Sequence, residues 1–265
     1  MTADLAVVAP GVPLLTEAPA GRHFAQLHRN SDLLVEAAGV FLEAGLRRDT
    51  GIVIIAVPEH TEPLLRQLEA GRLHAEAMRQ SGQLAVVDAE AALGEFLHNG
   101  SPDWSDFRAG MGGLLERLQA FGRGTRVYCE LADLLWRDGR SHAAIRLEEF
   151  WTALGRLVPF SLYCTYMLDP QHEDSYTGPL EEIGRTHSDI LGTVEDARFG
   201  EALDAASQEL YGIPLSKMIG FSAAEDGERR FPSGQRTMLW VRRNLPSSSA
   251  PMLERAHQYY HQAAV

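Results

Sequence analysis

GIVIIAV, at residues 51–57, is an unbroken run of apolar and mostly β-branched side chains. A strand with one face in water alternates apolar and polar residues, whereas a strand covered by helices on both faces is apolar throughout. The run therefore predicts a central strand of a parallel sheet. Three other stretches have the same character: LAVV at residues 84–87, RVYCEL at 126–131 and FSLYCTYM at 160–167.

Helix-like segments separate these strands. Residues 31–45 and 141–154 repeat apolar side chains at intervals of three and four, the period of an amphipathic helix, and residues 23–28 form a weaker strand candidate. We expect Ser31 and Thr61 to cap the helices that follow the first two strands. Strands that alternate with helices predict an α/β fold, in which a doubly wound, mainly parallel sheet is flanked by helices.

The alternation divides the chain into three parts. Residues 1–21 are broken by three prolines and are expected to form an irregular N-terminal arm. Residues 22–198 contain the predicted sheet. The alternation fails after Asp169, and residues 199–265 are expected to form a C-terminal extension that packs on the main domain or on a partner, with residues 237–242 as a short strand.

The composition argues against several classes of protein. The 265 residues carry a formal net charge of −12, which disfavours the basic face that a nucleic acid requires. No apolar run approaches the roughly 20 residues that span a bilayer, and the first residues lack the basic and apolar regions of a signal peptide. Two cysteines, Cys129 and Cys164, are too few for a disulfide scaffold. We therefore expect a cytoplasmic protein without direct contact to nucleic acid or membrane.

The candidate binding residues follow the predicted strands. In an open parallel sheet, ligands bind beyond the carboxyl ends of the strands. Six polar side chains at this edge are expected to bind a ligand: His28, Arg29, Asn30, Glu59, Glu130 and Tyr166. The two carboxylates in this set, together with Asp32, disfavour an anionic phosphate. A small, largely apolar molecule with one or two hydrogen-bonding groups fits such a site better.

The turn after the first strand lacks the elements of a phosphate-binding loop. It reads His-Arg-Asn-Ser-Asp at residues 28–32, without the glycines that open the backbone or the lysine that contacts the β- and γ-phosphates. Lys217, the only lysine of the chain, follows the predicted sheet. We therefore expect no ATP hydrolysis.

The sequence contains no recognisable catalytic or metal-binding motif. HExxH, CxxC and Gly-x-Ser-x-Gly are all absent, and both cysteines lie within apolar strands, where a thiol is unreactive. We expect no catalytic residue, no metal and no cofactor. One alternative stays open: a nucleotide-binding protein, or an enzyme that uses the region of Glu130, Cys164 and His187.

Two blocks of the sequence, RVYCELADLLW at residues 126–136 and LEEFWTAL at residues 147–154, resemble the MEDS family. This sensory domain is named from methanogens, methylotrophs and the dichloromethane regulator DcmR. Weaker similarity lies at residues 23–25, 41–46 and 160–164. The resemblance covers roughly residues 22 to 192.

The resemblance implies a degenerate relative of the RecA and KaiC ATPases that has lost the phosphate-binding loop. It also implies a non-catalytic domain for signal transduction that binds a small, hydrocarbon-derived ligand. Family members often accompany a histidine kinase or a transcription regulator, but neither a kinase core nor a helix-turn-helix is recognisable in this sequence. We therefore expect a stand-alone sensor or adaptor, and a homodimer or partner complex formed through the region after about residue 198.

Overall fold

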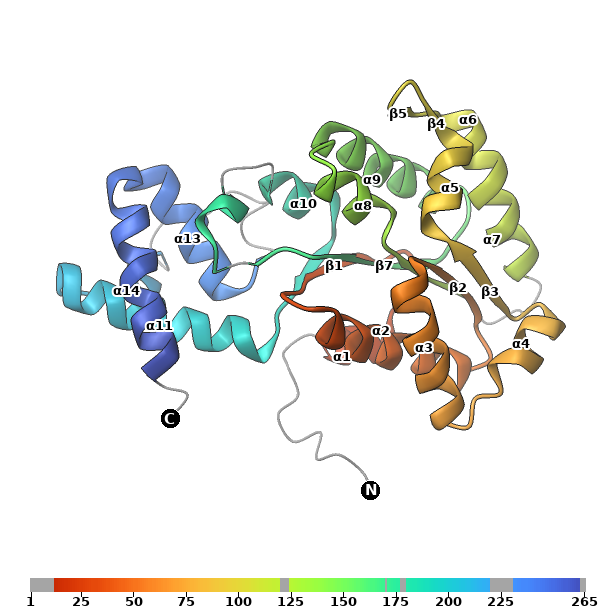
Figure 1. Ribbon diagram of the computed structural model, residues 1–265, viewed down its shortest axis with the longest axis horizontal. Helices are drawn as coiled ribbons and strands as arrows, with labels where there is room; N and C mark the ends of the chain where they lie inside the picture. The colour runs from red at the N-terminus through yellow and green to blue at the C-terminus, as the bar shows by residue number, and fades with distance from the viewer. Residues whose placement is uncertain (1–11, 120–123, 170, 177–179, 220–230, 263–265) are drawn as a thin grey trace. The chain divides into compact units, whose positions relative to one another are not determined.

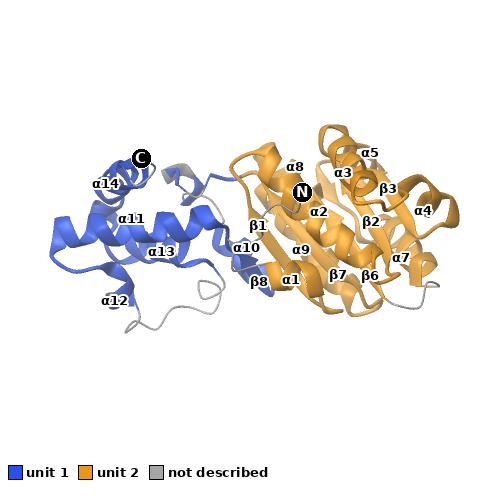
Figure 2. Cartoon of the chain, turned by 90° about the horizontal axis from the view of Figure 1, so that it is seen from below, with its two compact units in different colours: residues 1–11, 168–265 blue, residues 12–167 orange. Residues whose placement is uncertain are grey.

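The computed structural model describes residues 12–119, 124–169, 171–176, 180–219 and 231–262. The chain divides into two compact units (Figure 2): unit 2 spans residues 12–167, and unit 1 contains the described residues from 168 onward. The division falls before the boundary expected at residues 198 and 199. Residues 1–11 of the expected N-terminal arm lie outside the described residues.

Unit 2 is built on a parallel sheet (Figure 1). Its strands pair in the order β3-β2-β6-β7-β1, and each of these four pairings is parallel. The bounds are β1 (His23–Leu27), β2 (Gly51–Ala56), β3 (Leu84–Asp88), β6 (Thr125–Cys129) and β7 (Ser161–Tyr166). All residues of β2, β6 and β7 are buried, as continuous apolar runs require. The predicted parallel α/β fold is confirmed.

Helices cover both faces of this sheet. In Figure 1, α1 (Val12–Glu17), α2 (Ser31–Leu46) and α3 (Pro58–Ala70) lie on one side, and α8 (Leu131–Arg137) and α9 (Ser141–Gly155) lie on the other. The other elements of unit 2 are α4 (Ala75–Ser81), α5 (Ala89–Phe96), the short pair β4 (Leu97–His98) and β5 (Ser101–Pro102), α6 (Trp104–Phe107), a π-helical turn (Arg108–Gly112) and α7 (Gly113–Leu118). The sheet is therefore doubly wound, as predicted.

Neither Ser31 nor Thr61 is the cap that the sequence suggested, because both residues lie inside their helices. Asn30, rather than Ser31, caps α2, because its Oδ1 accepts the N–H of Leu33 at 3.0 Å. Helix α3 begins at Pro58 rather than at Thr61. Proline fits the first helical position because that residue needs no N–H donor there. Residues 59 and 60 consequently lie on the first turn of a helix and not in a loop.

Helix α1 forms where the sequence suggested an irregular arm, and Arg126 of β6 explains why. Its guanidinium is buried and donates hydrogen bonds of 2.8–3.1 Å to the main-chain carbonyls of Leu15, Thr16 and Glu17. A cation at the last turn of a helix satisfies carbonyls that have no partner within the helix. A fourth bond, to the carbonyl of Phe41, joins α2 to the same group. This tertiary contact is invisible in the local sequence.

Strand β7 presents different side chains to the two faces, because neighbouring residues of a strand alternate. Tyr163 packs against Phe24 and Phe41, with ring centroids 5.3 and 5.4 Å away, and so faces the side of α2. Cys164 and Tyr166 face the opposite side, toward α9. Residues in register on neighbouring strands share a face, so Cys129 of β6 lies on the same side as Cys164.

Unit 1 is largely helical. It contains a 3-10 turn (Glu173–Tyr176), α10 (Leu180–Thr186), β8 (Asp189–Leu191), α11 (Val194–Tyr211), α12 (Leu215–Ile219), α13 (Ser233–Asn244), a second 3-10 turn (Pro246–Ser248) and α14 (Ser249–Gln262). The short strand expected at residues 237–242 is wrong, because this segment lies inside α13. A short run of apolar residues in a sequence does not distinguish a strand from a buried helix.

Candidate functional site

Glu130 is the centre of a buried polar network at the carboxyl edge of the unit 2 sheet. It follows β6 and is the N-cap residue of α8, and its side chain is 2 % exposed. Its carboxylate accepts the main-chain N–H of Val57 at 3.0 Å, His60 Nδ1 at 2.8 Å and the Tyr128 hydroxyl at 2.5 Å. One side chain therefore joins the ends of β2 and β6 to the first turn of α3.

His60 connects this carboxylate to a residue at the surface. A carboxylate only accepts hydrogen bonds, so His60 Nδ1 carries the donated proton. Its other nitrogen, Nε2, lies 3.1 Å from the hydroxyl of Ser31. Ser31 is exposed and is the first residue of α2. The hydrogen bond that His60 donates to Glu130 raises the pKa of His60, although partial burial opposes this shift.

A second chain of hydrogen bonds runs beside the first. The Tyr163 hydroxyl donates to Gln26 Oε1 at 2.6 Å, so its oxygen accepts the proton of His28 Nε2, 3.2 Å away. His28 Nδ1 has no hydrogen-bond partner among the described residues. Burial, together with the nearby His60, lowers the pKa of His28 to about 3. His28 is therefore a neutral, buried imidazole at physiological pH.

The six residues expected to bind a ligand fall into two groups. Arg29, Asn30 and Glu59 are exposed at the carboxyl edge. The other three, His28, Glu130 and Tyr166, are buried and hydrogen-bonded within the protein.

The six candidate residues do not include three members of the network: Ser31, His60 and Tyr128. The sequence places His60 directly after Glu59 at the end of its strand, so it was counted among the polar residues of this edge but was not selected for the site. Tyr128 lies inside a strand, where an aromatic residue reads as core. The only usable signal was the glutamate at the end of an apolar strand, since a buried carboxylate needs several donors.

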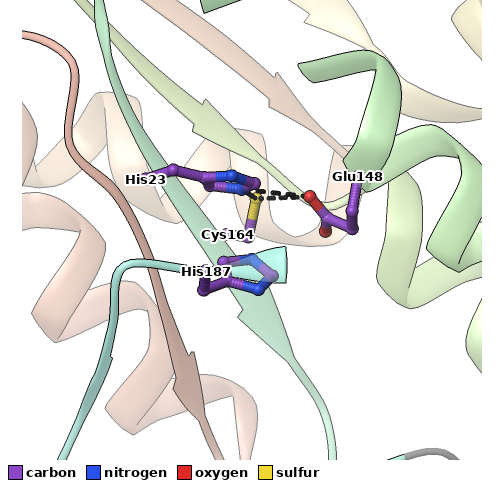
Figure 3. A group of neighbouring side chains, drawn as sticks. All are labelled: His23, Glu148, Cys164 and His187. Atoms are coloured by element: carbon purple, nitrogen blue, oxygen red, sulfur yellow. Dashed lines mark hydrogen bonds and ion pairs between the residues drawn. The ribbon is translucent and has the colours of Figure 1, made fainter. Parts of the chain in front are cut away.

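A second polar cluster lies on the opposite face of the sheet (Figure 3). His23 Nε2 is 3.0 Å from Glu148 Oε2, and Cys164 Sγ is 3.5 Å from the same nitrogen and 3.7 Å from the same oxygen. The Tyr166 hydroxyl donates to the other oxygen of Glu148. Burial, and then the neighbouring Cys129 and Glu148, raise the pKa of the Cys164 thiol well above its usual value.

The fold separates Glu130 from Cys164, two residues of the region named as a possible enzyme site. Glu130 belongs to the network of Tyr128 and His60, whereas Cys164 belongs to the cluster around Glu148. His187, also labelled in Figure 3, belongs to unit 1, where its Nδ1 lies 2.8 Å from the carbonyl of Ile183.

A cavity of about 370 Å³ lies apart from both networks, along α6 and α7. Its lining includes Trp104, Arg108 and Glu116. Within the described residues, no helix is both long and apolar enough to cross a membrane.

Comparison with known proteins gives one match. No curated protein and no solved structure matches the chain. The model of the MEDS family, described as the methanogen/methylotroph, DcmR sensory domain, matches residues 22–187. This match spans more than half of the chain, all five sheet strands of unit 2 and both polar networks. The chain therefore belongs to the MEDS family of sensory domains.

Proposed function

We propose that this protein is a non-catalytic sensor that binds a small, hydrocarbon-derived molecule at the carboxyl edge of the unit 2 sheet and passes the signal to a protein partner, such as a histidine kinase or a transcription regulator. The ligand would contact the exposed Arg29, Asn30, Ser31 and Glu59, above the buried His28 and Glu130. Tyr166 faces the other side of the sheet, so we retain it only as a residue that contributes from a distance.

The observation that carries the proposal is the chain from Ser31 through His60 to Glu130. A ligand that hydrogen-bonds with Ser31 changes the acceptor or donor available to His60, and His60 is fixed to a carboxylate shared by β2, β6 and α3. A signal requires that the ligand binds one arrangement of these elements better than another. A shared buried carboxylate supplies such a coupling, because losing one of its donors affects the others.

The absence of ATP hydrolysis is part of the proposal. Only three residues, His28, Arg29 and Asn30, separate β1 from α2. A phosphate-binding loop wraps the phosphates with an eight-residue glycine-rich segment, and Asn30 already occupies one N–H of the helix terminus. Isothermal calorimetry with ATP and Mg²⁺ is expected to give no binding, and micromolar affinity would contradict this proposal.

Exposed residues give the sharper test of ligand binding. Glu130→Ala would leave several buried donors without an acceptor, at about 1–3 kcal/mol each, and would confuse binding with folding. Arg29→Ala and Ser31→Ala avoid this problem. Saturation-transfer NMR with dichloromethane, acetone and 2-propanol as separate probes is expected to show binding to the wild type and a weaker signal for both variants.

Two controls make the result specific. Arg79→Ala removes another exposed arginine, on α4, and is expected to leave the signal unchanged. Trp104→Ala alters the cavity along α6 and α7. If Trp104→Ala abolishes the signal while Arg29→Ala and Ser31→Ala preserve it, the ligand binds at that cavity and the proposed site is wrong.

A second candidate function is nucleophilic catalysis, and the same three residues favour it. Ser31 Oγ, His60 and Glu130 have the hydrogen-bond order of a serine–histidine–carboxylate triad. In such a reaction, Ser31 Oγ attacks an ester carbonyl while His60 takes the hydroxyl proton and then gives it to the departing alcohol. Water hydrolyses the acyl-serine.

A fluorophosphonate probe separates the two candidates, because it forms an Oγ–P bond and releases fluoride only at an activated serine. Catalysis requires that peptide mass spectrometry finds the label on Ser31 and that His60→Gln removes it. Ser141, the first residue of α9, is the matched control serine. If the wild-type protein binds the small-molecule probes but the fluorophosphonate does not label Ser31, the result supports a sensor and excludes nucleophilic catalysis by Ser31.

A further inference from the structure

Figure 3 draws four side chains that offer potential ligand atoms, and three of these atoms belong to unit 2, on the α9 side of its sheet. They are His23 Nε2 from the start of β1, Cys164 Sγ from the middle of β7 and Glu148 Oε2 from α9. We propose that these three side chains form a binding site for a divalent transition metal of the zinc type. The site is separate from the Ser31–His60–Glu130 network, so the two proposals stand or fall independently.

The distances between the donor atoms match tetrahedral coordination. Bond lengths of about 2.0–2.3 Å to zinc place nitrogen and oxygen ligands about 3.4 Å apart, and place sulfur about 3.5 Å from either. The corresponding separations are 3.0 Å for His23 and Glu148, 3.5 Å for His23 and Cys164, and 3.7 Å for Cys164 and Glu148. Shifts of a few tenths of an ångström would place all three atoms around one ion.

The chemistry of the donors selects the class of metal. A thiolate, an imidazole and a carboxylate suit zinc and its neighbours in the first transition row, whereas Mg²⁺ and Ca²⁺ take oxygen ligands. The Cys164 thiol loses its proton to solvent on binding, as does His23 if its Nε2 is protonated. The positive charge of the ion then compensates the two anionic ligands inside an apolar layer.

The fold holds these ligands on rigid elements. Parallel pairing fixes His23 opposite Leu162 and Ala25 opposite Cys164, so His23 and Cys164 share one face of the sheet. The Tyr166 hydroxyl holds the second oxygen of Glu148, which orients the first oxygen toward the other two ligands. Hydrogen-bonded groups behind a metal ligand commonly set its orientation in this way.

The three ligands of unit 2 leave one tetrahedral position for a further ligand, such as water or a small exogenous molecule. The His23 side chain is 13 % exposed, whereas that of Glu148 is 2 % exposed. His23 therefore marks the side of the cluster that reaches toward solvent within unit 2. Such a site would recognise small ligands with a thiol, alcohol or imidazole donor.

Cobalt reports directly on the coordination. Full-length protein is treated with a chelator under reducing conditions and then titrated with Co²⁺. Wild-type protein is expected to bind about one equivalent and to show a near-ultraviolet sulfur-to-cobalt band with strong visible bands, the signature of tetrahedral Co²⁺ bound to thiolate. Added Zn²⁺ is expected to displace the cobalt and remove these bands.

Near-isosteric variants identify the ligands. Cys164→Ser is expected to abolish the sulfur-to-cobalt band, while Cys129→Ser, the matched change at the in-register cysteine of β6, is expected to keep it. His23→Gln and Glu148→Gln are expected to weaken Co²⁺ binding at least as much as the 10–100-fold loss that follows removal of an outer hydrogen-bond partner. Circular dichroism verifies that each variant is folded.

Two results would overturn the proposal. One is a folded wild-type protein without the band at stoichiometric Co²⁺, which would leave the cluster as a hydrogen-bond network alone. The other is metal binding that is unchanged in Cys164→Ser. If Cys164→Ser does not fold, His23→Gln decides the question, because the partly exposed position of His23 tolerates substitution. An unchanged affinity of His23→Gln for Co²⁺ would also overturn the proposal.

Discussion

Acidification should destabilise unit 2 through His28. This imidazole is 2 % exposed, and its pKa is lowered to about 3, chiefly by burial. In the unfolded chain, the pKa of histidine returns to about 6.5. Between these two pKa values, His28 binds a proton in the unfolded state but not in the folded state. Its contribution to the free energy of unfolding is therefore fully present above pH 6.5 and is lost progressively as the pH falls toward 3.

The magnitude follows from the two pKa values. At pH 5 about 97 % of unfolded chains carry the proton at this position, whereas the folded protein carries almost none. The free energy of unfolding is therefore about 2 kcal/mol lower at pH 5 than at pH 7 from this residue alone. This difference in the free energy of unfolding changes little for any pKa of folded His28 below about 4. The reason is that the pKa in the unfolded chain sets the pH at which the loss begins.

His28→Gln isolates this contribution. Other groups titrate over the same range: His60 has a raised pKa, and burial raises that of Asp133 to about 6. Both take up protons more readily in the folded state and so oppose the effect of His28. They are present in the wild type and in the variant, and their contributions cancel when the two proteins are compared at each pH.

Urea unfolding at pH 7 and pH 5 provides the measurement. In a Trp240→Phe background, the three remaining tryptophans all belong to unit 2, so fluorescence reports on that unit. The wild type is expected to lose about 2 kcal/mol more than His28→Gln between the two pH values. His98→Gln, an exposed histidine paired with Asp106, should not reproduce this difference. A difference below about 0.5 kcal/mol would mean that His28 is not held neutral in the folded state.

Two further predictions concern stability. Arg126→Gln removes a buried cation that donates to four carbonyls, and it is expected to lower the free energy of unfolding by about 3 kcal/mol or more, with loss of hydrogen-exchange protection in α1. Arg126→Lys should rescue it only in part, and full stability in the glutamine variant would contradict the reasoning. In unit 1, Thr193→Ala removes the capping box of α11 and is expected to lower stability by about 1 kcal/mol, measured at Trp240, while Thr193→Ser preserves it. Equal losses in both Thr193 variants would exclude the cap as the cause.

The sheet could be predicted because each central strand is covered on both faces, which leaves a continuous apolar run in the sequence. The two segments that were predicted wrongly have a common cause. Helix α1 depends on a side chain more than one hundred positions away, and residues 237–242 become part of α13 through packing within unit 1. The local propensity of a segment does not include such contacts, so tertiary packing determined the secondary structure of both segments.

The candidate site could be predicted only as a position at one edge of the sheet. Glu130 was named because it ends an apolar strand, but its partner His60 lies 70 residues earlier. Tyr166 was placed at the same edge, although alternation along β7 turns it toward Glu148 on the other face. A shift of one residue changes the face of a strand side chain, and the end of a strand is the least certain part of its sequence signal.

The two buried carboxylates make a structural role alone a weak explanation for both networks. Glu130 and Glu148 each lie beneath one face of the sheet, and each accepts a hydrogen bond from a buried tyrosine hydroxyl. Removing a carboxylate from water costs several kcal/mol, and well-packed apolar side chains of similar volume often stabilise a protein equally well or better. A fold that needed only stability would be served by apolar residues at both positions. The two proposed ligands, a small molecule above Glu130 and a metal ion beside Glu148, would explain why both positions carry a carboxylate.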